Sequence, residues 1–243
     1  MSAAAELPEL SARGLSRRFG AHAALDGIDL EVPRGSTFAL LGANGAGKTT
    51  FLRIAAGLLL PSAGEVRIAG ISAVEEPARV QRRIGYVMET SRLYPELRVR
   101  GLLRFLAAAR GMPRGEREAT VERALERFGL GAVARRPIGN LSKGFQQRVS
   151  LAQAFLHDPP LVIVDEPTGG LDPLQRQEVQ ERLRALRGER TLLLSTHDLG
   201  EARALADRVA VLSAGRLVAL GPADELLGHG DPLALFRAAG GGA

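Results

Sequence analysis

The hydrophobic positions of this chain follow two patterns. Short runs that are apolar almost throughout, such as 38–41 and 161–164, are typical of strands buried on both faces of a parallel sheet. Between these runs, apolar residues recur every three or four positions, which predicts helices that pack on such a sheet. Further predicted strands are 65–69, 84–89, 191–195 and two within 209–220, and the predicted helices are 77–83, a long one from 139–144 to about 157, 173–187 and 198–206.

Two parts of the chain depart from this alternation. Residues 8–19 and 28–32 alternate apolar with polar side chains, and we predict two antiparallel strands joined through a glycine-containing turn. Residues 96–128 are helical in pattern, with a break at 111–115. A block of helices between strands predicts a helical subdomain, inserted at about 90–157. The fold class is therefore α/β, with a mostly parallel sheet, helices on both its faces, an N-terminal antiparallel subdomain and the inserted helices.

Length and composition favour an ordinary globular protein. The chain has 243 residues, enough for one large domain, which we expect at 1–228 and to be followed by a flexible tail at 229–243. Cysteine is absent, which excludes disulfides and thiolate chemistry. The first residues do not resemble a signal peptide, and no apolar run reaches the roughly 18 residues of a membrane span. We therefore expect a chain that is soluble by itself and intracellular.

Charge changes this picture little. The formal net charge is +5, which could suit nucleic acid or anionic lipid. Arginines nevertheless alternate with glutamates at helical spacing, as over 114–127, and this is typical of a solvated helix face. We expect no nucleic-acid partner.

One glycine-rich stretch carries the strongest chemical signal. It follows the run at 38–41, precedes a helical segment and matches the phosphate-binding loop G-x-x-x-x-G-K-[ST]. Glycines permit positive φ and close backbone approach, so successive N–H groups can form a cradle for an anion at a helix N-terminus. Lys48 would reach the β and γ phosphates of a nucleotide, and the Thr49 hydroxyl would be a ligand of Mg²⁺. The predicted nucleotide-binding residues are Gly42, Asn44, Gly45, Ala46, Gly47, Lys48, Thr49 and Thr50. The alternative is a turn that matches the motif by chance.

Two further observations support a phosphate site. Lys48 and Lys143 are the only lysines of the chain, so a lysine at 48 indicates that the forked guanidinium of arginine does not serve there. The strand at 161–164 ends in Asp165 and Glu166, and the carboxyl ends of parallel strands face the ligand crevice. Asp165 is placed to hold Mg²⁺, and Glu166 to orient and deprotonate an attacking water. A helix-capping acidic pair is the alternative.

Four more motifs, by their order and spacing, indicate a known family. They are Leu141-Ser142-Lys143-Gly144-Phe145-Gln146-Gln147-Arg148, Asp165-Glu166-Pro167-Thr168, Gly170-Leu171-Asp172 and Ser195-Thr196-His197-Asp198. With the phosphate loop, they resemble the nucleotide-binding subunit of an ABC transporter over residues 10–228. A phosphate loop alone would also permit kinases, GTPases or helicases.

The resemblance implies a role for each matching residue. Phe19 corresponds to the aromatic residue that stacks on adenine, although it could instead be a core residue that closes a strand. Ser142 and Gly144 correspond to the signature motif, which contacts the γ-phosphate of ATP held by another protomer. Asp172 corresponds to the loop that communicates between the two sites. His197 corresponds to the switch histidine beside the γ-phosphate, and without the other motifs it would be read as a capping or packing residue.

The sequence departs from the usual family pattern at two places. Glu89 stands where glutamine is usual, and it can still bind Mg²⁺ together with Thr49 and Asp165 while adding negative charge. The signature reads Leu-Ser-Lys-Gly-Phe, with Lys143 and Phe145 in place of glycine and glutamine. Lys143 would be attracted to the facing phosphates, or is only a solvated lysine. Both departures resemble the branch of ABC ATPases that pairs with export-type permeases on separate chains.

The resemblance also implies partners. We expect an ATP-dependent dimer, in the simplest case a homodimer, with ATP and Mg²⁺ in the seam between protomers. A permease would dock near residues 90–110, where Leu93, Tyr94 and Leu97 are the apolar candidates, and would hold the chain at the inner face of the cell membrane. Apolar residues at this spacing more often belong to the core.

Two other functions remain open from the sequence. One is an ABC-type ATPase that remodels a ribosome or DNA complex, but such proteins usually carry two cassettes or a long coiled-coil insertion. The phosphate loop and the signature each occur once here. The other is a regulatory ATPase at the membrane that transports nothing.

Overall fold

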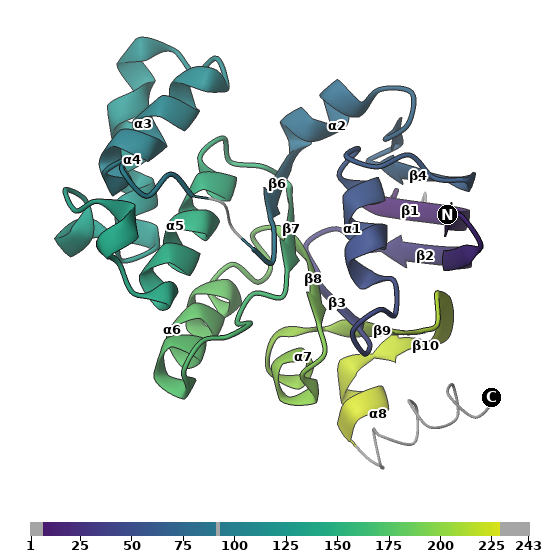
Figure 1. The fold of residues 1–243 in the computed structure, drawn as a ribbon. Helices are drawn as coiled ribbons and strands as arrows, with labels where there is room; N and C mark the ends of the chain where they lie inside the picture. The colour runs from purple at the N-terminus through teal and green to yellow at the C-terminus, as the bar shows by residue number, and fades with distance from the viewer. Residues whose placement is uncertain (1–6, 91–92, 229–243) are drawn as a thin grey trace, which may run out of the picture.

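A six-stranded sheet lies at the centre of the computed structural model, which describes residues 7–90 and 93–228 (Figure 1). The strand order is β10-β9-β3-β8-β7-β6. Neighbours from β6 to β9 are parallel, and β10 pairs antiparallel with β9 at one edge. The strands are β3 (Thr37–Leu41), β6 (Ile84–Val87), β7 (Leu161–Asp165), β8 (Thr191–Thr196), β9 (Arg208–Ser213) and β10 (Arg216–Pro222). The predicted mostly parallel sheet is confirmed. The predicted tail at 229–243 lies outside the described residues.

Both faces of this sheet are buried, which explains the uninterrupted apolar runs. In β3, Ala39 and Leu41 pack into one hydrophobic cluster with the helices of one face. Phe38 and Leu40 point the other way, into a second cluster. Because side chains alternate along a strand, a strand covered on both faces must be apolar at every position.

A four-stranded antiparallel sheet covers the second cluster. Its order is β2-β1-β4-β5, with the strands β1 (Leu10–Phe19), β2 (His22–Val32), β4 (Ala63–Ile68) and β5 (Ile71–Ser72). The antiparallel pair at the N-terminus is confirmed, but the second strand begins at His22 and not at residue 28. Register shifts along the β1–β2 pair, and the positive φ of Gly27, break the two-residue period that would have marked the earlier start.

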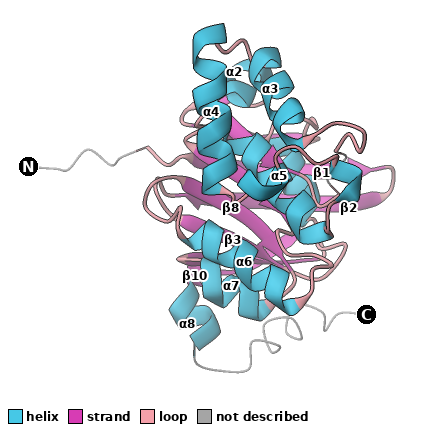
Figure 2. Ribbon diagram, turned by 90° about the vertical axis from the view of Figure 1, so that its left-hand side faces the viewer, coloured by secondary structure: helices cyan, strands magenta, loops and turns pink. Residues whose placement is uncertain are grey.

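Helices pack into both hydrophobic clusters, one on each face of the central sheet, and Figure 2 shows the helices in front of one face. Helix α1 (Lys48–Ala55) packs into the second cluster, on the side of the antiparallel sheet. The remaining helices of the core are α2 (Pro77–Arg83), α6 (Pro173–Arg184), α7 (Leu199–Leu205) and α8 (Ala223–Gly228). None of the helices in the described part of the chain is long and apolar enough to cross a bilayer.

Three further helices form the inserted block, which we call the helical subdomain. They are α3 (Val99–Ala109), α4 (Arg114–Arg127) and α5 (Lys143–Phe155), with 3-10 turns η1 (Gly131–Val133) and η2 (Ile138–Asn140) between α4 and α5. The break between α3 and α4 falls where the sequence predicted it. Figure 1 shows the subdomain beside β6, on the opposite side of the molecule from β1 and β2. The limits of a single domain at 1–228 stay a prediction.

The helical subdomain and the sheet meet closely at Gly85 of β6. A Cβ atom on Gly85 would lie 2.4 Å from the carbonyl oxygen of Ala154 in α5, so only glycine fits. Beside this contact, His157 Nε2 lies 3.0 Å from the carbonyl oxygen of Ile84. Burial, with the charge of Arg110, lowers the pKa of His157 to about 4, so the ring is neutral at neutral pH. Strand β6 and helix α5 are thus tightly packed.

Candidate active site

The phosphate loop joins β3 to α1, and two of its glycines have no room for a side chain. A Cβ atom on Gly42 would lie 2.5 Å from the carbonyl oxygen of Leu212, and one on Gly47 would lie 2.5 Å from that of Ala24. Gly47 also has φ 105° and stands directly before the first residue of α1. Gly42 and Gly47 are therefore required by backbone packing, whereas Gly45 has open space around it and a positive φ of 83°.

This loop forms one wall of a cavity of about 330 Å³. Its lining contains most of the residues that the sequence predicted, brought together from β1, β2, the loop with the start of α1, and the segments after β6 and β7: Phe19, His22, Ala24, Ala43, Asn44, Gly45, Ala46, Gly47, Lys48, Thr49, Thr50, Glu89 and Glu166. His22, Ala24 and Ala43 were not among the predicted binding residues. His22 pairs with Phe19 across the β1–β2 turn, so only the strand pairing places it here.

Lys48 lies at the closed end of this cavity. Its side chain is 6% exposed, and its Nζ donates to the carbonyl oxygen of Gly42 at 2.7 Å. The same ammonium lies 3.3 Å from Glu166 Oε1. A buried cation held by a carbonyl oxygen and a carboxylate is positioned to attract a further anion in the loop.

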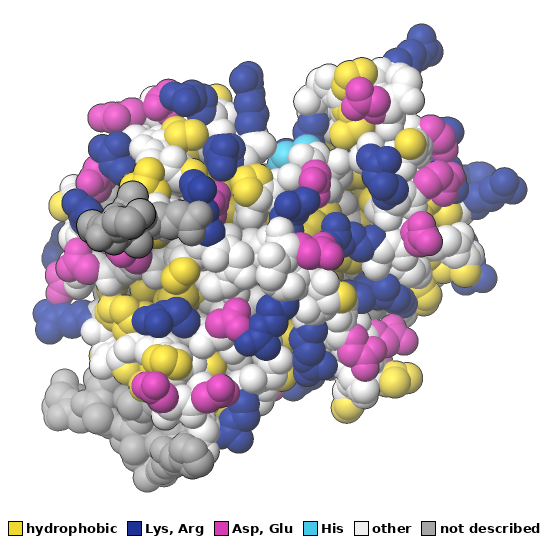
Figure 3. All heavy atoms as spheres, turned by 180° about the vertical axis from the view of Figure 1, so that it is seen from behind, with side chains coloured by type: hydrophobic (Ala, Val, Ile, Leu, Met, Phe, Trp, Pro, Cys, Tyr) yellow, Lys and Arg dark blue, Asp and Glu magenta, His cyan; other side chains and the backbone are white. Residues whose placement is uncertain are grey.

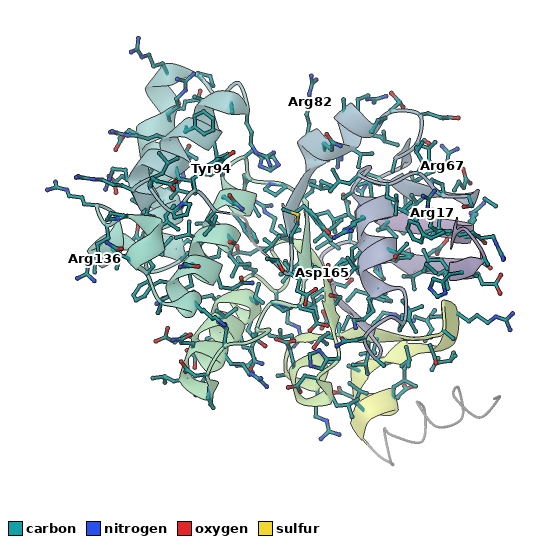
Figure 4. All side chains as sticks on the ribbon, in the orientation of Figure 1. Arg17, Arg67, Arg82, Tyr94, Arg136 and Asp165 are labelled. Carbon is teal, nitrogen blue, oxygen red and sulfur yellow. The ribbon has the colours of Figure 1, made fainter. Side chains whose placement is uncertain are left out.

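Asp165 is the last residue of β7 and Glu166 follows it, at the middle of the molecule, where Figure 4 labels Asp165. Asp165 Oδ1 accepts hydrogen bonds from Ser195 Oγ at 2.5 Å and from Thr49 Oγ1 at 3.2 Å. Glu166 Oε2 lies 2.9 Å from Nδ1 of His197, on the loop after β8. The two carboxylates are buried in separate networks. They do not cap a helix, which removes that alternative.

Glu166 is held in an unusual backbone conformation. Its φ is +49°, which costs a residue with a Cβ atom about 1 kcal/mol or more. Its N–H donates to Ser195 Oγ at 3.0 Å, which helps to hold this conformation. The turn directs the carboxylate back toward Lys48.

Glu201, a further buried carboxylate, contacts the segment that follows Glu166. Thr168 Oγ1 donates to Oε1 of Glu201 in α7 at 2.6 Å, and both side chains are buried. Burial raises the pKa of Glu201, the Glu166 and Asp198 carboxylates add to this, and hydrogen bonds from threonine side chains oppose it. Sequence reasoning missed Glu201, because only the packing of α7 shows that it is buried.

The raised pKa of Glu201 predicts a pH-dependent stability. A carboxyl group with a higher pKa in the folded state stabilises the fold fully only below its unfolded pKa, about 4.3, and loses this as pH rises through the folded pKa. A glutamine can accept the Thr168 hydrogen bond without charge. We expect the stability of Glu201→Gln relative to the unchanged chain to rise between pH 4 and pH 8 in urea unfolding. The exposed Glu116→Gln is the control, and a difference that does not change with pH would contradict the prediction.

The same cavity offers oxygen ligands for a magnesium ion. Thr49 Oγ1 and Asp165 Oδ1 lie within hydrogen-bond distance of each other, and Glu89 lines the cavity. Within residues 7–90 and 93–228, no three His, Cys, Asp or Glu side chains gather into a metal site of their own. These oxygens therefore suit an ion that takes its remaining ligands from phosphates and water, as Mg²⁺ does in nucleotide sites.

Phe19 lies at the open side of the cavity, at the end of β1. Its side chain is 46% exposed, so the core alternative is wrong. The guanidinium carbon of Arg17 lies 4.6 Å from the centre of its ring. An exposed aromatic face near the phosphate loop is able to stack on a planar base.

Ser142 and Gly144 do not reach the cavity of their own chain. Ser142 is the N-cap of α5, where its Oγ accepts from the N–H of Phe145 at 3.4 Å. The N–H of Gly144 donates to Oε1 of Gln175, in α6, at 3.1 Å. The cavity within one chain is thus formed without the signature motif, and its predicted contact with another protomer's nucleotide stays a prediction.

The phosphate loop, the buried Lys48 and the acidic pair at the end of a neighbouring parallel strand define a P-loop nucleoside triphosphatase. The family model of the ABC transporter matches residues 25–169, more than half of the chain. The chain belongs to the ABC transporter family, as an ATP-binding subunit, and the enzymatic activity of this class is ATP hydrolysis.

Relatives of this chain are named for several different transport functions. The daunorubicin resistance ATP-binding protein DrrA3 of Streptomyces coeruleorubidus is 41% identical over 88% of this chain and 68% of its own. The Nod factor export ATP-binding protein I of Ralstonia nicotianae is 37% identical over 91% and 70%. An iron import protein, FbpC of Streptomyces avermitilis, is 40% identical over 90% and 66%.

Solved structures agree with this assignment. The ATP-binding subunit of an ABC transporter superposes with a TM-score of 0.83 and 34% identity, over 95% of this chain and 99% of its own. The cassette MJ0796, as a dimer with ADP and phosphate after hydrolysis, gives 0.79 and 27%, over 88% and 98%. The predicted α/β ATPase fold is confirmed.

Proposed function

We propose that this chain binds MgATP in the cavity around the phosphate loop and hydrolyses it to drive export through a separate permease. The observation that carries the catalytic part is the contact of the buried Lys48 with the buried Glu166, whose carboxylate is also bonded to the exposed His197. The relatives named for drug resistance and for Nod factor export support the direction, whereas the iron importer leaves it open. Glu89 and Lys143, which depart from the common family pattern, favour export.

Lys48 binds the β and γ phosphates in this proposal, and the loop N–H groups complete the cradle. Thr49, Asp165 and Glu89 would hold Mg²⁺, and the bound ion neutralises negative charge on the phosphates. Phe19 supplies the surface for the adenine ring. The fit rests on the donor set, because all of these side chains lie in or beside one cavity.

Glu166 acts as the general base. Its Oε1 lies 3.3 Å from the ammonium of Lys48, and this oxygen accepts no hydrogen bond from the described residues. A γ-phosphate competes with this carboxylate for Lys48, which leaves Oε1 able to accept a proton from an attacking water. His197, bonded to Oε2, holds the carboxylate in orientation, and in this proposal it contacts the γ-phosphate.

The active unit is a dimer with two composite sites. One copy supplies the cavity, and the other supplies Ser142 and Gly144 at the N-terminus of α5. N–H groups at a helix start favour an anion, so this end of α5 is suited to the γ-phosphate. Binding of MgATP closes the seam, and hydrolysis reopens it.

A permease would dock on the segment at 90–110, which places the chain on the cytoplasmic side of a membrane. Tyr94, which Figure 4 labels near α3, is 56% exposed, and Phe105 is 57% exposed. Leu97 is partly exposed as well, whereas Leu93 packs against the core. Phe105 was not among the predicted docking residues. Figure 3 views the molecule from behind relative to Figure 1. Lys and Arg side chains are interspersed there with Asp and Glu, which does not favour nucleic acid on that face.

Affinity capture from detergent-solubilised membranes tests this function. We expect the tagged chain to bring down a protein with several spanning segments in the presence of MgATP. Tyr94→Asp and Phe105→Asp should each reduce its recovery at least about tenfold, since a buried apolar contact is worth 1–3 kcal/mol or more. Leu60→Asp is the control, because Leu60 is 63% exposed on the antiparallel sheet side. Recovery of ribosomal or DNA-bound proteins without a membrane protein would instead support the remodelling ATPase.

A further inference from the structure

Two charged side chains near the proposed seam make no ion pair within the described part of the chain. Glu89 is exposed and lines the nucleotide cavity. Lys143 is exposed at the first residue of α5, and its Nζ reaches toward Gly170, where it would lie 3.9 Å from an added Cβ atom. Several arginines on the surface, by contrast, have a carboxylate partner, as Arg104 has in Glu118.

The charges around these two residues have opposite signs. Glu89 and Glu166 line the same cavity, and Thr49 in its lining donates a hydrogen bond to the Asp165 carboxylate. Three carboxylates therefore lie in or beside the cavity. Lys143 stands at the N-terminus of α5, which carries the positive end of the helix dipole. A second copy therefore presents a cation where the first presents excess negative charge.

We propose that Lys143 of one copy forms an ion pair with Glu89 of a second copy across the seam. This rests on the proposed composite dimer, in which Ser142 and Gly144 meet the phosphate end of the partner's cavity. Lys143 lies between these two residues in sequence. Glu89 lines the same cavity as Thr49, beside the position of the phosphates.

This pair makes the dimer selective for copies of its own kind. A subunit with glutamine at the position of Glu89 and glycine at that of Lys143 offers neither charge. Pairing with such a subunit would leave one Glu89 facing no cation and one Lys143 facing no carboxylate. Charge complementarity at a seam favours the right partner and penalises the wrong one. The proposed ion pair thus favours a symmetric dimer with two such pairs.

Charge reversal in trans tests the pair. The parent is Glu166→Gln, which holds ATP in the closed dimer, and the measurement is the dimer dissociation constant by light scattering in MgATP. Lys143→Glu and Glu89→Lys, each alone, place like charges opposite each other in both seams of a homodimer. We expect each to weaken dimerisation at least about tenfold, the lower end of measured coupling for close charge pairs. An equimolar mixture of the two variants should dimerise within about threefold of the parent, because both seams of the mixed dimer then hold opposite charges.

Each outcome decides something different. A mixture that dimerises no better than the tighter of the two variants would overturn the ion pair. Glu89→Lys without any effect on dimerisation would also overturn it, because Lys143 would then contact the phosphate and not Glu89. Binding of ATP to each variant as a monomer is measured separately, which removes any loss of nucleotide affinity from the comparison. Absence of a dimer in the parent would overturn the composite dimer itself, and the ion pair with it.

Discussion

Glu166→Gln is expected to slow ATP turnover by about a thousandfold while leaving ATP bound. General bases contribute about 10²- to 10⁴-fold to rates, and the amide cannot accept the proton of an attacking water. The side chain keeps its size, so its place beside Lys48 and His197 should persist. Phosphate release measures the turnover, and equilibrium dialysis with labelled ATP measures the binding.

The same variant should accumulate as an ATP-bound dimer. Because hydrolysis is what reopens the seam in the proposed cycle, light scattering in MgATP should give twice the mass of the protomer. Glu116→Gln on the exposed face of α4 serves as the control and should turn over as the unchanged chain does. Turnover of the Glu166 variant within threefold of the unchanged chain would show that another group is the base.

Lys48→Ala is expected to abolish both binding and turnover. The ammonium is the cation at the closed end of the cavity, and hydrogen bonds to charged groups contribute about 1.5–3 kcal/mol each. Loss of two such contacts with phosphate should weaken ATP binding at least about a hundredfold in calorimetry. It also leaves Glu166 buried without its cation.

Lys48→Arg separates charge from shape. The guanidinium keeps the charge, but it is larger, and only 6% of the lysine side chain is exposed between Gly42 and Glu166. We expect this variant to fail as well. If the arginine variant bound ATP as the unchanged chain does, charge alone would be sufficient, and the scarcity of lysine in this chain would have no bearing on the site.

The local part of this site could be predicted because it depends on short-range geometry. The segment around Gly47 places a turn between an apolar strand and a helix, and its glycines allow the backbone to approach Ala24. Asp165 was placed because parallel strands present their carboxyl ends at one edge. Both predictions needed only the order of elements along the chain.

The parts that were missed depend on pairing between distant segments. His22 enters the cavity because β1 and β2 pair through register shifts, which no period in the sequence reveals. Glu201 reads as an exposed helix residue until α7 is packed against Thr168, 33 positions earlier in the chain. The bond of Gly144 to Gln175 likewise joins residues 31 positions apart. Such contacts are set by tertiary packing, so neither propensity nor motif could show them.

The close contact of Gly85 with Ala154 has a consequence for the proposed dimer as a whole. Strand β6 leads to Glu89 in its own cavity, while α5 begins at the residues that face the partner's nucleotide. Because the strand and the helix touch here without space between them, we expect them to shift together. In the proposed dimer, occupation of one site would then affect the other, and nucleotide binding would be cooperative, because the seam needs both ATP molecules to close.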